Sequence, residues 1–378
     1  MTTTSPAPHT AHAAPVAAPS PEATSTADEI LYLRARDVRE ALQEVDPVAV
    51  IRAVLRRHGA GDTVLPDEAY LPWTTPAGDG ARSLNMPAYV GAGEGQGEDG
   101  TPVAGTKVIN GNPGNVRRGL PRASGVTMLF DVATARITCI MEGARISATR
   151  TAAVTAAAAG ALEGPPVRCL AVIGAGALAA AHLSLLPGRL PQLREVRLFD
   201  LDGERAEALR RAAAPDLEAR GVRLEVAPSA EGAIRPAQLI VPVTTTTTGY
   251  IALDWLQPGA ILVNVSLDDP LPEVALRADR LFVDDWPLVR ADSRRLLGRM
   301  YRAGQIEGPD APPSPRGTTP RPIDGELGQV LAGLRPGRLR ERDVILVNPF
   351  GLAIEDVALA AEVHRAATRR GLGLWLER

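Results

Sequence analysis

The feature that most constrains the fold is a glycine turn near the middle of the chain. Residues 167–173, VRCLAVI, form an apolar run with the length of a buried strand, and GAGALAAAH follows at once. Gly174 permits a tight turn, and Gly176 lets the backbone approach a phosphate where a helix starts at Ala177. Ala179 lets that helix pack closely on the strand. The pattern favours a dinucleotide-binding βαβ unit, although a related domain that binds something else can share it.

A second strand strengthens this prediction. EVRLFD ends at Asp200, about 25 residues after the turn, where a carboxylate can accept hydrogen bonds from an adenosine ribose. Asp200 favours NAD over NADP, because a carboxylate repels a 2′-phosphate and no arginine follows immediately. Short apolar strands then alternate with helices as far as DRLFVDD, residues 279–285. This alternation predicts an α/β fold with a doubly wound parallel sheet of the Rossmann type.

A run of threonines follows a later strand of this predicted sheet. VTTTTTGY begins at Val243, where the fourth strand would end at the edge that lines the cofactor crevice. The hydroxyls of Thr244 and Thr245 can meet ribose or nicotinamide at that edge. The alternative is a β-branched strand end with a polar cap, and the sequence does not separate the two interpretations.

Two carboxylates come after the next strand. ILVNVSLDDP leaves the sheet at Ser266, which we assign to the cofactor site, and runs into Asp268 and Asp269. A carboxylate at that edge faces the nicotinamide and can handle a proton on a substrate amine. Asp residues before Pro also form turns and helix caps, so each of the two has a structural alternative.

Composition argues against several classes of function. A formal net charge of −3 gives no reason to expect a nucleic-acid partner. Cys139 and Cys169 lie in apolar runs and the five histidines are scattered, so we expect neither a disulfide nor a metal site. No window offers about 18 uninterrupted apolar residues for a membrane span, and the first residues lack the pattern of a secretory signal. We therefore expect a cytoplasmic protein without a membrane partner.

A lysine in the turn GTKVINGNPGN, Lys107, is a candidate substrate ligand. Taken alone it has a simpler interpretation, because most lysines are solvated. Arg150 follows about forty residues later in ISATRTAAVT, among small residues in a predicted helix, which is an unusual place to desolvate a guanidinium without a partner. Two cations and a Gly/Asn turn in a domain next to a dinucleotide site suggest a pocket for an amino-acid carboxylate.

Five blocks of sequence, taken in order, resemble the ornithine cyclodeaminase and mu-crystallin family from about Leu31 to the C-terminus. They are MPAYVG, GTKVINGNPGN, ARISATRTAAVT, VIGAGALA with VRLFD, and DGELGQVLAG with NPFGLAIEDVALA. The resemblance implies a homodimer in which an α+β substrate-binding and dimerisation domain, built from both chain ends, adjoins a central Rossmann domain. We accordingly assign residues 28–163 and 322–378 to the first domain and 164–321 to the NAD-binding domain, after a disordered tail over residues 1–27.

The resemblance also implies roles for individual residues. Lys107 and Arg150 would hold the substrate carboxylate, with Lys107 assisting imine chemistry. Asp269 would bind an amine or transfer protons, and Asp268 is its less favoured neighbour. The family's chemistry begins with hydride abstraction from the α-carbon of an amino acid, which gives an imine. Cyclodeaminases return the hydride, whereas dehydrogenases release NADH and an oxo acid.

One departure from the family pattern bears on the substrate. Ornithine cyclodeaminases carry a further carboxylate-binding arginine upstream of the Met-Pro motif, where this chain has LPWTTP; the nearest arginine is Arg82, a candidate substrate ligand. Arg82 before Met86 and Pro87, with LPRASGV and VSLDDP, looks closer to the branch that splits N-(2-amino-2-carboxyethyl)-L-glutamate into 2,3-diaminopropionate and 2-oxoglutarate. We therefore favour a dehydrogenase of an amino acid or N-substituted amino acid. A cyclodeaminase, an imine reductase and a mu-crystallin-like ligand-binding protein are the alternatives.

Overall fold

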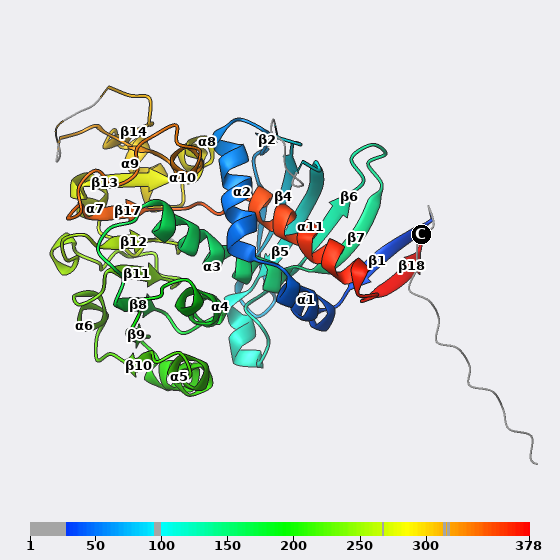
Figure 1. The fold of residues 1–378 in the computed structure, drawn as a ribbon, viewed down its shortest axis with the longest axis horizontal. Helices are drawn as coiled ribbons and strands as arrows, with labels where there is room; N and C mark the ends of the chain where they lie inside the picture. Colours follow the sequence, from blue (N-terminus) through cyan, green and yellow to red (C-terminus); the bar gives the residue numbers. More distant parts are fainter. Residues whose placement is uncertain (1–27, 94–99, 267, 313–314, 316–317) are drawn as a thin grey trace, which may run out of the picture.

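A computed structural model describes residues 28–93, 100–266, 268–312, 315 and 318–378. Over these residues the chain forms two eight-stranded sheets with helices packed on them, and the two sheets lie at opposite ends of the molecule (Figure 1). The predicted disordered tail, residues 1–27, and residues 94–99 of the glycine-rich stretch GAGEGQGEDGTP lie outside the described residues.

The first sheet combines both ends of the chain. Its strand order is β18-β1-β7-β6-β5-β4-β2, and β3 pairs with β4. The strands are β1 (Glu29–Leu33), β2 (Thr63–Val64), β3 (Ala69–Thr74), β4 (Gly80–Val90), β5 (Val103–Gly111), β6 (Ala123–Phe130), β7 (Ile137–Glu142) and β18 (Leu374–Glu377). The last strand was not predicted; it pairs antiparallel with β1, which brings Glu377 near the C-terminus opposite Glu29 (Figure 1).

Three helices cover one face of the first sheet. They are α2 (Pro47–Gly59), α3 (Gly143–Ala161) and α11 (Ala353–Arg369). The helix predicted around Arg150 is thus confirmed as α3. Its alanines let it pack closely: Ala152, Ala153 and Ala157 are completely buried. The helices α1 (Ala35–Ala41) and η1 (Leu42–Glu44) connect β1 to α2.

Strand register places Lys107 beneath the helices. Lys107 lies opposite Met86 on β4 and opposite Thr127 on β6. Residues directly opposite one another in a sheet point to the same face, and Met86 is buried in the core. Lys107 therefore points inward toward α11 rather than into solvent.

The second sheet is parallel throughout, as predicted. Its order is β10-β9-β8-β11-β12-β17-β13-β16. The strands are β8 (Cys169–Ile173), β9 (Glu195–Phe199), β10 (Arg223–Val226), β11 (Leu239–Pro242), β12 (Ile261–Val263), β13 (Arg280–Val283), β16 (Gly325–Glu326) and β17 (Ile345–Val347). Its longer helices are α4 (Ala177–Leu185) and α5 (Gly203–Glu218). The central strands β8, β11 and β12 are buried at every residue, which is typical of a parallel sheet covered on both faces.

The strand pairing differs from our boundary at residue 322. We placed residues 322–378 with the substrate-binding domain, but β16 and β17 lie in the second sheet. The reason is that Ile345–Val347 is fully buried and pairs parallel with both β12 and β13, so this strand fills a gap in the centre of the sheet. Only α11 and β18 return to the first sheet.

Two short helices follow β13 in the arginine-rich stretch of the second half of the chain. The structure has α8 (Trp286–Ala291) and α9 (Leu296–Arg302), joined by an extended segment that starts at Asp292. The Asp292 carboxylate accepts a hydrogen bond from the backbone N–H of Arg294, which satisfies the segment locally in place of a helical bond.

The remaining described elements are short. They are η2 (Pro113–Arg118), η3 (Leu186–Gly188), α6 (Ala230–Ile234), η4 (Leu253–Trp255), α7 (Pro272–Arg277), β14 (Ile306–Glu307), β15 (Arg321–Pro322) and α10 (Leu327–Leu331).

Candidate active site

Lys107 and Arg150 converge on one carboxylate at the start of α11. Lys107 Nζ donates to Asp356 Oδ2 at 2.6 Å, and Arg150 Nε lies 3.3 Å from the same oxygen. Arg150 Nη1 also donates to Glu355 Oε2 at 2.9 Å. Lys107 is only 2 % exposed and both acids are completely buried. The two cations that the sequence suggested thus lie together, and the acids that hold them were not in the predicted site.

This cluster contains polar atoms without a hydrogen-bond partner among the described residues. The buried examples around Lys107 are Thr127 Oγ1, Arg150 Nε, Glu355 Oε1 and Asp356 Oδ1. The Arg150 Nε contact to Asp356 is close enough for an ion pair but is not aligned as a hydrogen bond. Because buried polar groups are almost always paired, several unpaired atoms in one place leave hydrogen-bonding capacity for a polar ligand or water.

Burial changes the proton affinity of the cluster. It lowers the pKa of Lys107, although the Asp356 carboxylate opposes this change. It raises the pKa of Glu355 to about 8, against the attraction of Arg150. A lysine whose pKa is lowered gives up its proton more readily than an ordinary solvated lysine.

The buried Glu355 predicts a pH dependence of stability. Its folded pKa lies above the ordinary value of 4.5. Between about pH 4.5 and 8 the folded chain therefore holds a proton that the unfolded chain releases, and stability falls as pH rises. We expect Glu355→Gln to flatten this dependence by up to about 1.4 kcal/mol per pH unit. Urea unfolding from pH 5 to 8 measures the slope, and equal slopes in both proteins would contradict the prediction.

Asp269 lies at the carboxyl edge of the second sheet, inside a shell of hydroxyl groups. Its carboxylate accepts hydrogen bonds from Thr244 Oγ1 at 2.7 Å, Tyr250 OH at 2.9 Å and Ser266 Oγ. Asp269 is completely buried, and burial raises its pKa while the three hydroxyls partly offset that effect. Asp268 instead forms an ion pair with Arg299 at 3.1 Å. Tyr250 was not predicted, although it ends the threonine run.

The glycine turn has the geometry that the sequence predicted. Gly174 has φ +107°, and a Cβ there would lie 3.0 Å from the carbonyl oxygen of Val243. Gly176 is the N-cap of α4, and the nearest atom to a Cβ at that position is Arg205 Nη2 at 3.9 Å. The turn therefore leaves space over the N-terminus of α4, where a phosphate binds in dinucleotide domains. The backbone at this turn can hold the pyrophosphate of a dinucleotide. Ala177 is the first residue of α4, and Ala179 is buried in its first turn.

Asp200 lies beside this turn rather than free in solvent. Its Oδ2 accepts a hydrogen bond from the backbone N–H of Ala175 at 2.7 Å, and its Oδ1 accepts one from Asp202. Both oxygens retain lone pairs for a ribose hydroxyl. The exposed Arg205 on α5 is a cation near the same turn, which the linear sequence did not suggest.

We expect Asp200→Ala to narrow a preference for NAD over NADP by roughly tenfold, because it removes the charge that repels a 2′-phosphate. The ratio of kcat/KM for the two cofactors measures the effect. Asp202→Ala is the matched control, since Asp202 caps α5 nearby. An unchanged ratio in the Asp200 variant would remove this residue from cofactor selection.

Other predicted residues lie apart from the lysine cluster. Arg82 points to the same face of the first sheet as Lys107 but pairs with Gly111, four residues or about 13 Å along β4. Thr245 is exposed beyond the Asp269 shell. Within the described part of the chain, no hydrogen bond or ion pair joins Lys107 or Arg150 to Arg82 or Asp269. Their grouping around a substrate stays a prediction.

His182 has a structural role. Its two ring nitrogens lie 2.9 Å from Thr155 Oγ1 and 2.7 Å from the carbonyl oxygen of Leu178. Burial lowers its pKa to about 4, so the ring is neutral at physiological pH. The contact joins α3 to α4 across the two halves of the molecule.

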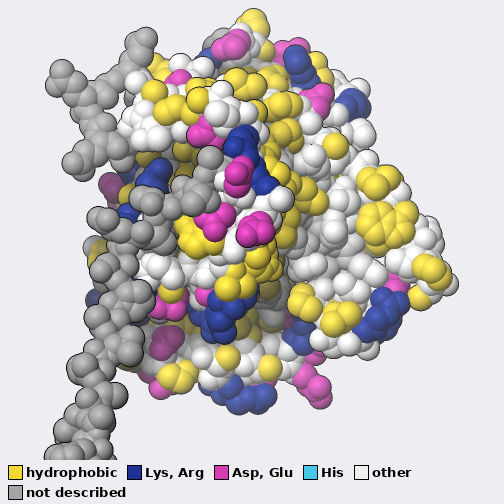
Figure 2. Space-filling model, turned by 90° about the vertical axis from the view of Figure 1, so that its right-hand side faces the viewer, with side chains coloured by type: hydrophobic (Ala, Val, Ile, Leu, Met, Phe, Trp, Pro, Cys, Tyr) yellow, Lys and Arg dark blue, Asp and Glu magenta, His cyan; other side chains and the backbone are white. Residues whose placement is uncertain are grey.

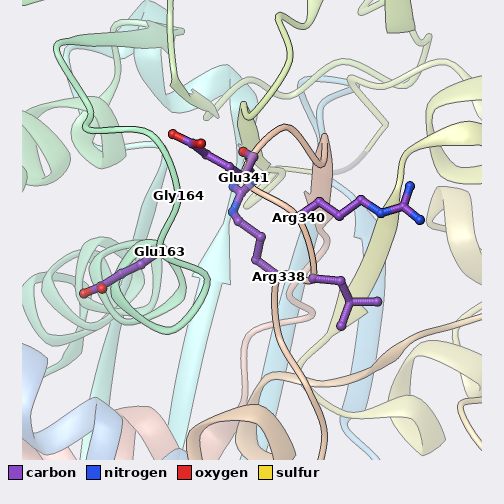
Figure 3. A pocket seen from close by; sticks show the side chains of 6 residues that line it. Glu163, Gly164, Arg338, Arg340 and Glu341 are labelled. Carbon is purple, nitrogen blue, oxygen red and sulfur yellow. Dashed lines mark hydrogen bonds between the residues drawn. The ribbon is translucent and has the colours of Figure 1, made fainter.

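A surface hollow of about 370 Å³ lies where α3 ends. Glu163 and Gly164 line one side and the segment 338–341 lines the other, and the side chains of Glu163, Arg340 and Glu341 point in different directions (Figure 3). Arg338 donates to the carbonyl oxygens of Leu162 and Gly259, so it fastens the junction between the sheets. The hollow lacks the convergent polar groups of a substrate site.

Among the residues that the structure describes, no group of three or more His, Cys, Asp or Glu side chains has an arrangement that could hold a metal ion. None of the helices that the structure describes combines the length and the apolar character needed to cross a membrane.

Comparison with known proteins gives matches over nearly the whole chain. The model of the ornithine cyclodeaminase/mu-crystallin family matches residues 29–371. The N-((2S)-2-amino-2-carboxyethyl)-L-glutamate dehydrogenase of Staphylococcus aureus is 30% identical over 92% of this chain and 98% of its own. The crystal structure of CmnK superposes with a TM-score of 0.82 at 39% identity, over 93% of this chain and 99% of that one. An archaeal alanine dehydrogenase dimer with bound NAD has a TM-score of 0.75 at 21% identity, over 92% and 99%.

Proposed function

The chain belongs to the ornithine cyclodeaminase/mu-crystallin family, and from that premise we propose that it is an NAD-dependent dehydrogenase that oxidises the α-carbon of an N-substituted amino acid. Its relatives include NAD(P)-dependent amino-acid dehydrogenases and reductases, and the chain is an oxidoreductase of this kind. The substrate that we propose is N-(2-amino-2-carboxyethyl)-L-glutamate, which the 30% identical relative is named for.

The observation that carries the proposal is the buried cluster around Lys107. Lys107 and Arg150 share the carboxylate of Asp356. Four polar atoms of this cluster lack hydrogen-bond partners among the described residues. A guanidinium group can bind a substrate carboxylate through two parallel N–H groups, and an ammonium group adds a further donor. A desolvated lysine in contact with that carboxylate can also exchange a proton with the neighbouring carbon or water. We assign the carboxylate site to Lys107 and Arg150, with Arg82 as a further candidate at greater distance.

A bound NAD would supply the hydride acceptor, held at Gly174, Gly176, Asp200 and the threonine run. In the proposed reaction the substrate amine loses a proton to Asp269, and the α-carbon of the glutamate part loses a hydride. Water then adds to the resulting imine, and Lys107 in its neutral form accepts a proton from that water. Collapse gives 2-oxoglutarate, 2,3-diaminopropionate, NADH and a proton from substrate, NAD⁺ and water.

We also propose a homodimer formed through the first sheet. The helices pack on the face that carries Lys107, and the opposite face carries half-buried apolar side chains, among them Val108, Val126, Met128 and Ile140. Exposed Leu71 and Trp73 continue this surface along β3, whereas Tyr70 lies opposite Leu84 and points to the face that carries Lys107. Figure 2 shows hydrophobic side chains gathered on this end of the molecule. An apolar sheet face that the helices leave uncovered fits a second copy, and sedimentation equilibrium tests the proposed homodimer.

The proposed activity is tested by absorbance at 340 nm with purified protein, NAD and a panel of amino acids. The panel contains N-(2-amino-2-carboxyethyl)-L-glutamate, alanine, ornithine and lysine, with ammonia and proline assayed in parallel. We expect net NADH with the first compound. Proline or pipecolate with ammonia and no net NADH would instead establish a cyclodeaminase.

A further inference from the structure

Two connections at the carboxyl edge of the second sheet are fastened together at Asp269. One is the threonine loop, residues 243–251, which follows β11, and the other follows β12. The backbone N–H groups of Tyr250 and Ile251 both donate to the carbonyl oxygen of Asp269 at 2.9 Å. Gly249 lets the two connections approach, because a Cβ there would lie 2.8 Å from the carbonyl oxygen of Pro270. The threonine loop therefore holds the backbone of Asp269 in place.

Two hydroxyl groups of the threonine loop converge on one oxygen of the Asp269 side chain. Thr244 Oγ1 donates to Oδ1 at 2.7 Å, and Tyr250 OH donates to the same oxygen at 2.9 Å. Thr244 Oγ1 also accepts the backbone N–H of Thr246 at 3.2 Å, which fixes its hydroxyl within the loop. A carboxylate oxygen has two lone pairs for hydrogen bonds, so these two donors occupy Oδ1 fully.

The other carboxylate oxygen, Oδ2, has a different kind of partner. The buried Ser266 hydroxyl donates to it, and the same hydroxyl also reaches the carbonyl oxygen of Pro242 at 2.9 Å. When Asp269 is ionised, Ser266 donates to Oδ2. When Oδ2 carries a proton, it can donate that proton to Ser266 while Ser266 donates to Pro242. Ser266 therefore serves both protonation states, whereas Thr244 and Tyr250 favour the ionised one, because a hydrogen bond to a charged acceptor is stronger.

The charge of Asp269 depends on these hydroxyl groups, because none of the described cations forms an ion pair with it. The neighbouring acid, Asp268, pairs instead with Arg299 at 3.1 Å. Burial raises the pKa of Asp269, and the three hydroxyls and its own backbone N–H act against that rise. Burial and the charge of Asp269 also raise the pKa of Tyr250 above its ordinary value of 10, so the phenol keeps its proton and remains a donor.

We propose that Tyr250 and Thr244 are positioning residues for Asp269, which occupy Oδ1 and leave Oδ2 as the oxygen that takes the proton from the substrate amine. This inference rests on the proposed function and names the atom at which its proton transfer occurs. The N–H bond of the amine breaks and its electron pair stays on nitrogen, while an O–H bond forms at Oδ2. The Ser266 hydroxyl then turns to the carbonyl oxygen of Pro242, so no buried group loses its partner.

The test is the pH profile of kcat/KM, which reports the ionisations of the free enzyme. Tyr250→Phe keeps the ring and the backbone bonds and removes only the hydroxyl. Because that hydroxyl stabilises the ionised carboxylate, we expect the acid limb to move up by roughly one pH unit, with the limiting kcat within about tenfold. Thr244→Val should move the limb in the same direction. Tyr301→Phe is the control, because the Tyr301 ring packs against Trp286 and its hydroxyl forms no hydrogen bond with the described residues.

Ser266→Ala separates the two oxygens of Asp269. Because Ser266 serves both protonation states, its loss should move the acid limb by less than half the shift of Tyr250→Phe. The substrate titrates identically in every variant, so the differences between the limbs belong to the enzyme. A shift in Ser266→Ala as large as that in Tyr250→Phe would overturn the assignment of Oδ2.

The outcomes separate this inference from the proposed function. If the unaltered enzyme forms no NADH with any amino acid of the panel, the proposed function is wrong and the inference falls with it. If NADH forms and the acid limb of Tyr250→Phe stays within about 0.3 pH unit of the unaltered enzyme, or moves equally in Tyr301→Phe, only the inference is overturned. Thermal melting shows whether each variant folds, and Thr244→Val is an independent test should Tyr250→Phe not fold.

Discussion

Replacing Lys107 by methionine is expected to lower kcat by roughly 10³-fold, within the range of a lost proton-transfer group, while NADH binds as before. The substitution keeps the length of the side chain and removes the ammonium group that contacts Asp356 at 2.6 Å. The effect should fall on kcat as well as KM, because Lys107 is proposed both to hold the substrate carboxylate and to exchange protons. Steady-state kinetics measure the loss, and fluorescence titration with NADH measures cofactor binding.

The Lys107 result needs a control for folding, because Lys107→Met leaves Asp356 buried with Arg150 as its remaining cation. Lys107→Met with Asp356→Asn removes both members of the pair and leaves no uncompensated charge. We expect this double variant to recover thermal stability but not activity. Activity within tenfold of the unaltered enzyme in either variant would show that Lys107 has no chemical role.

Replacing Asp269 by asparagine is expected to lower kcat by roughly 10² to 10⁴-fold, because an amide cannot accept a proton from the substrate amine. Thr244 and Tyr250 can still donate to the amide oxygen, so the local structure should remain. The pKa of Asp269 is raised by burial, so the acid limb of the kcat profile should lie above the ordinary carboxyl value of 3.8. The variant should lose this limb.

Asp268→Asn is the matched control for Asp269. Both carboxylates are buried and adjacent, but Asp268 pairs with Arg299 instead of the hydroxyl groups. We expect kcat of the Asp268 variant to remain within about fivefold, because no proton transfer is assigned to it. A larger loss in Asp268→Asn than in Asp269→Asn would transfer the proposed role to Asp268.

Local sequence predicted the elements whose signals are short-range. The turn at Gly174 follows from glycine spacing, and the structure confirms its positive φ. The parallel sheet follows from buried apolar strands that alternate with helices. Strands β16 and β17 were misplaced because they pair with strands more than forty residues away, and nothing in a three-residue run such as Ile345–Val347 names its partner. The same limit explains the missed β18, whose partner β1 is at the other end of the chain.

In the candidate site, too, local sequence identified single residues, whereas only the fold brought them into contact. The residue types in GTKVINGNPGN and ISATRTAAVT were enough to single out Lys107 and Arg150, because a lysine in a Gly/Asn turn and an arginine among small residues both call for anionic partners. The adjacent acids in AIEDVALAA were the signal for those partners, since two carboxylates at the start of an apolar helix need buried cations. Only the packing of α11 against β5 brings Asp356 to Lys107, across 249 residues of sequence.

The sequence by itself thus determined the family, the type of cofactor turn and the two cations, because each depends on residue identity at short spacing. Tertiary structure decided which charges face one another. Lys107, Arg150 and Asp356 come from three separate segments, and no local pattern relates them. Whether a cation is solvated, neutralised or left available for a substrate depends on the charges that the fold places around it, since desolvation and Coulomb interaction act through space and not along the chain.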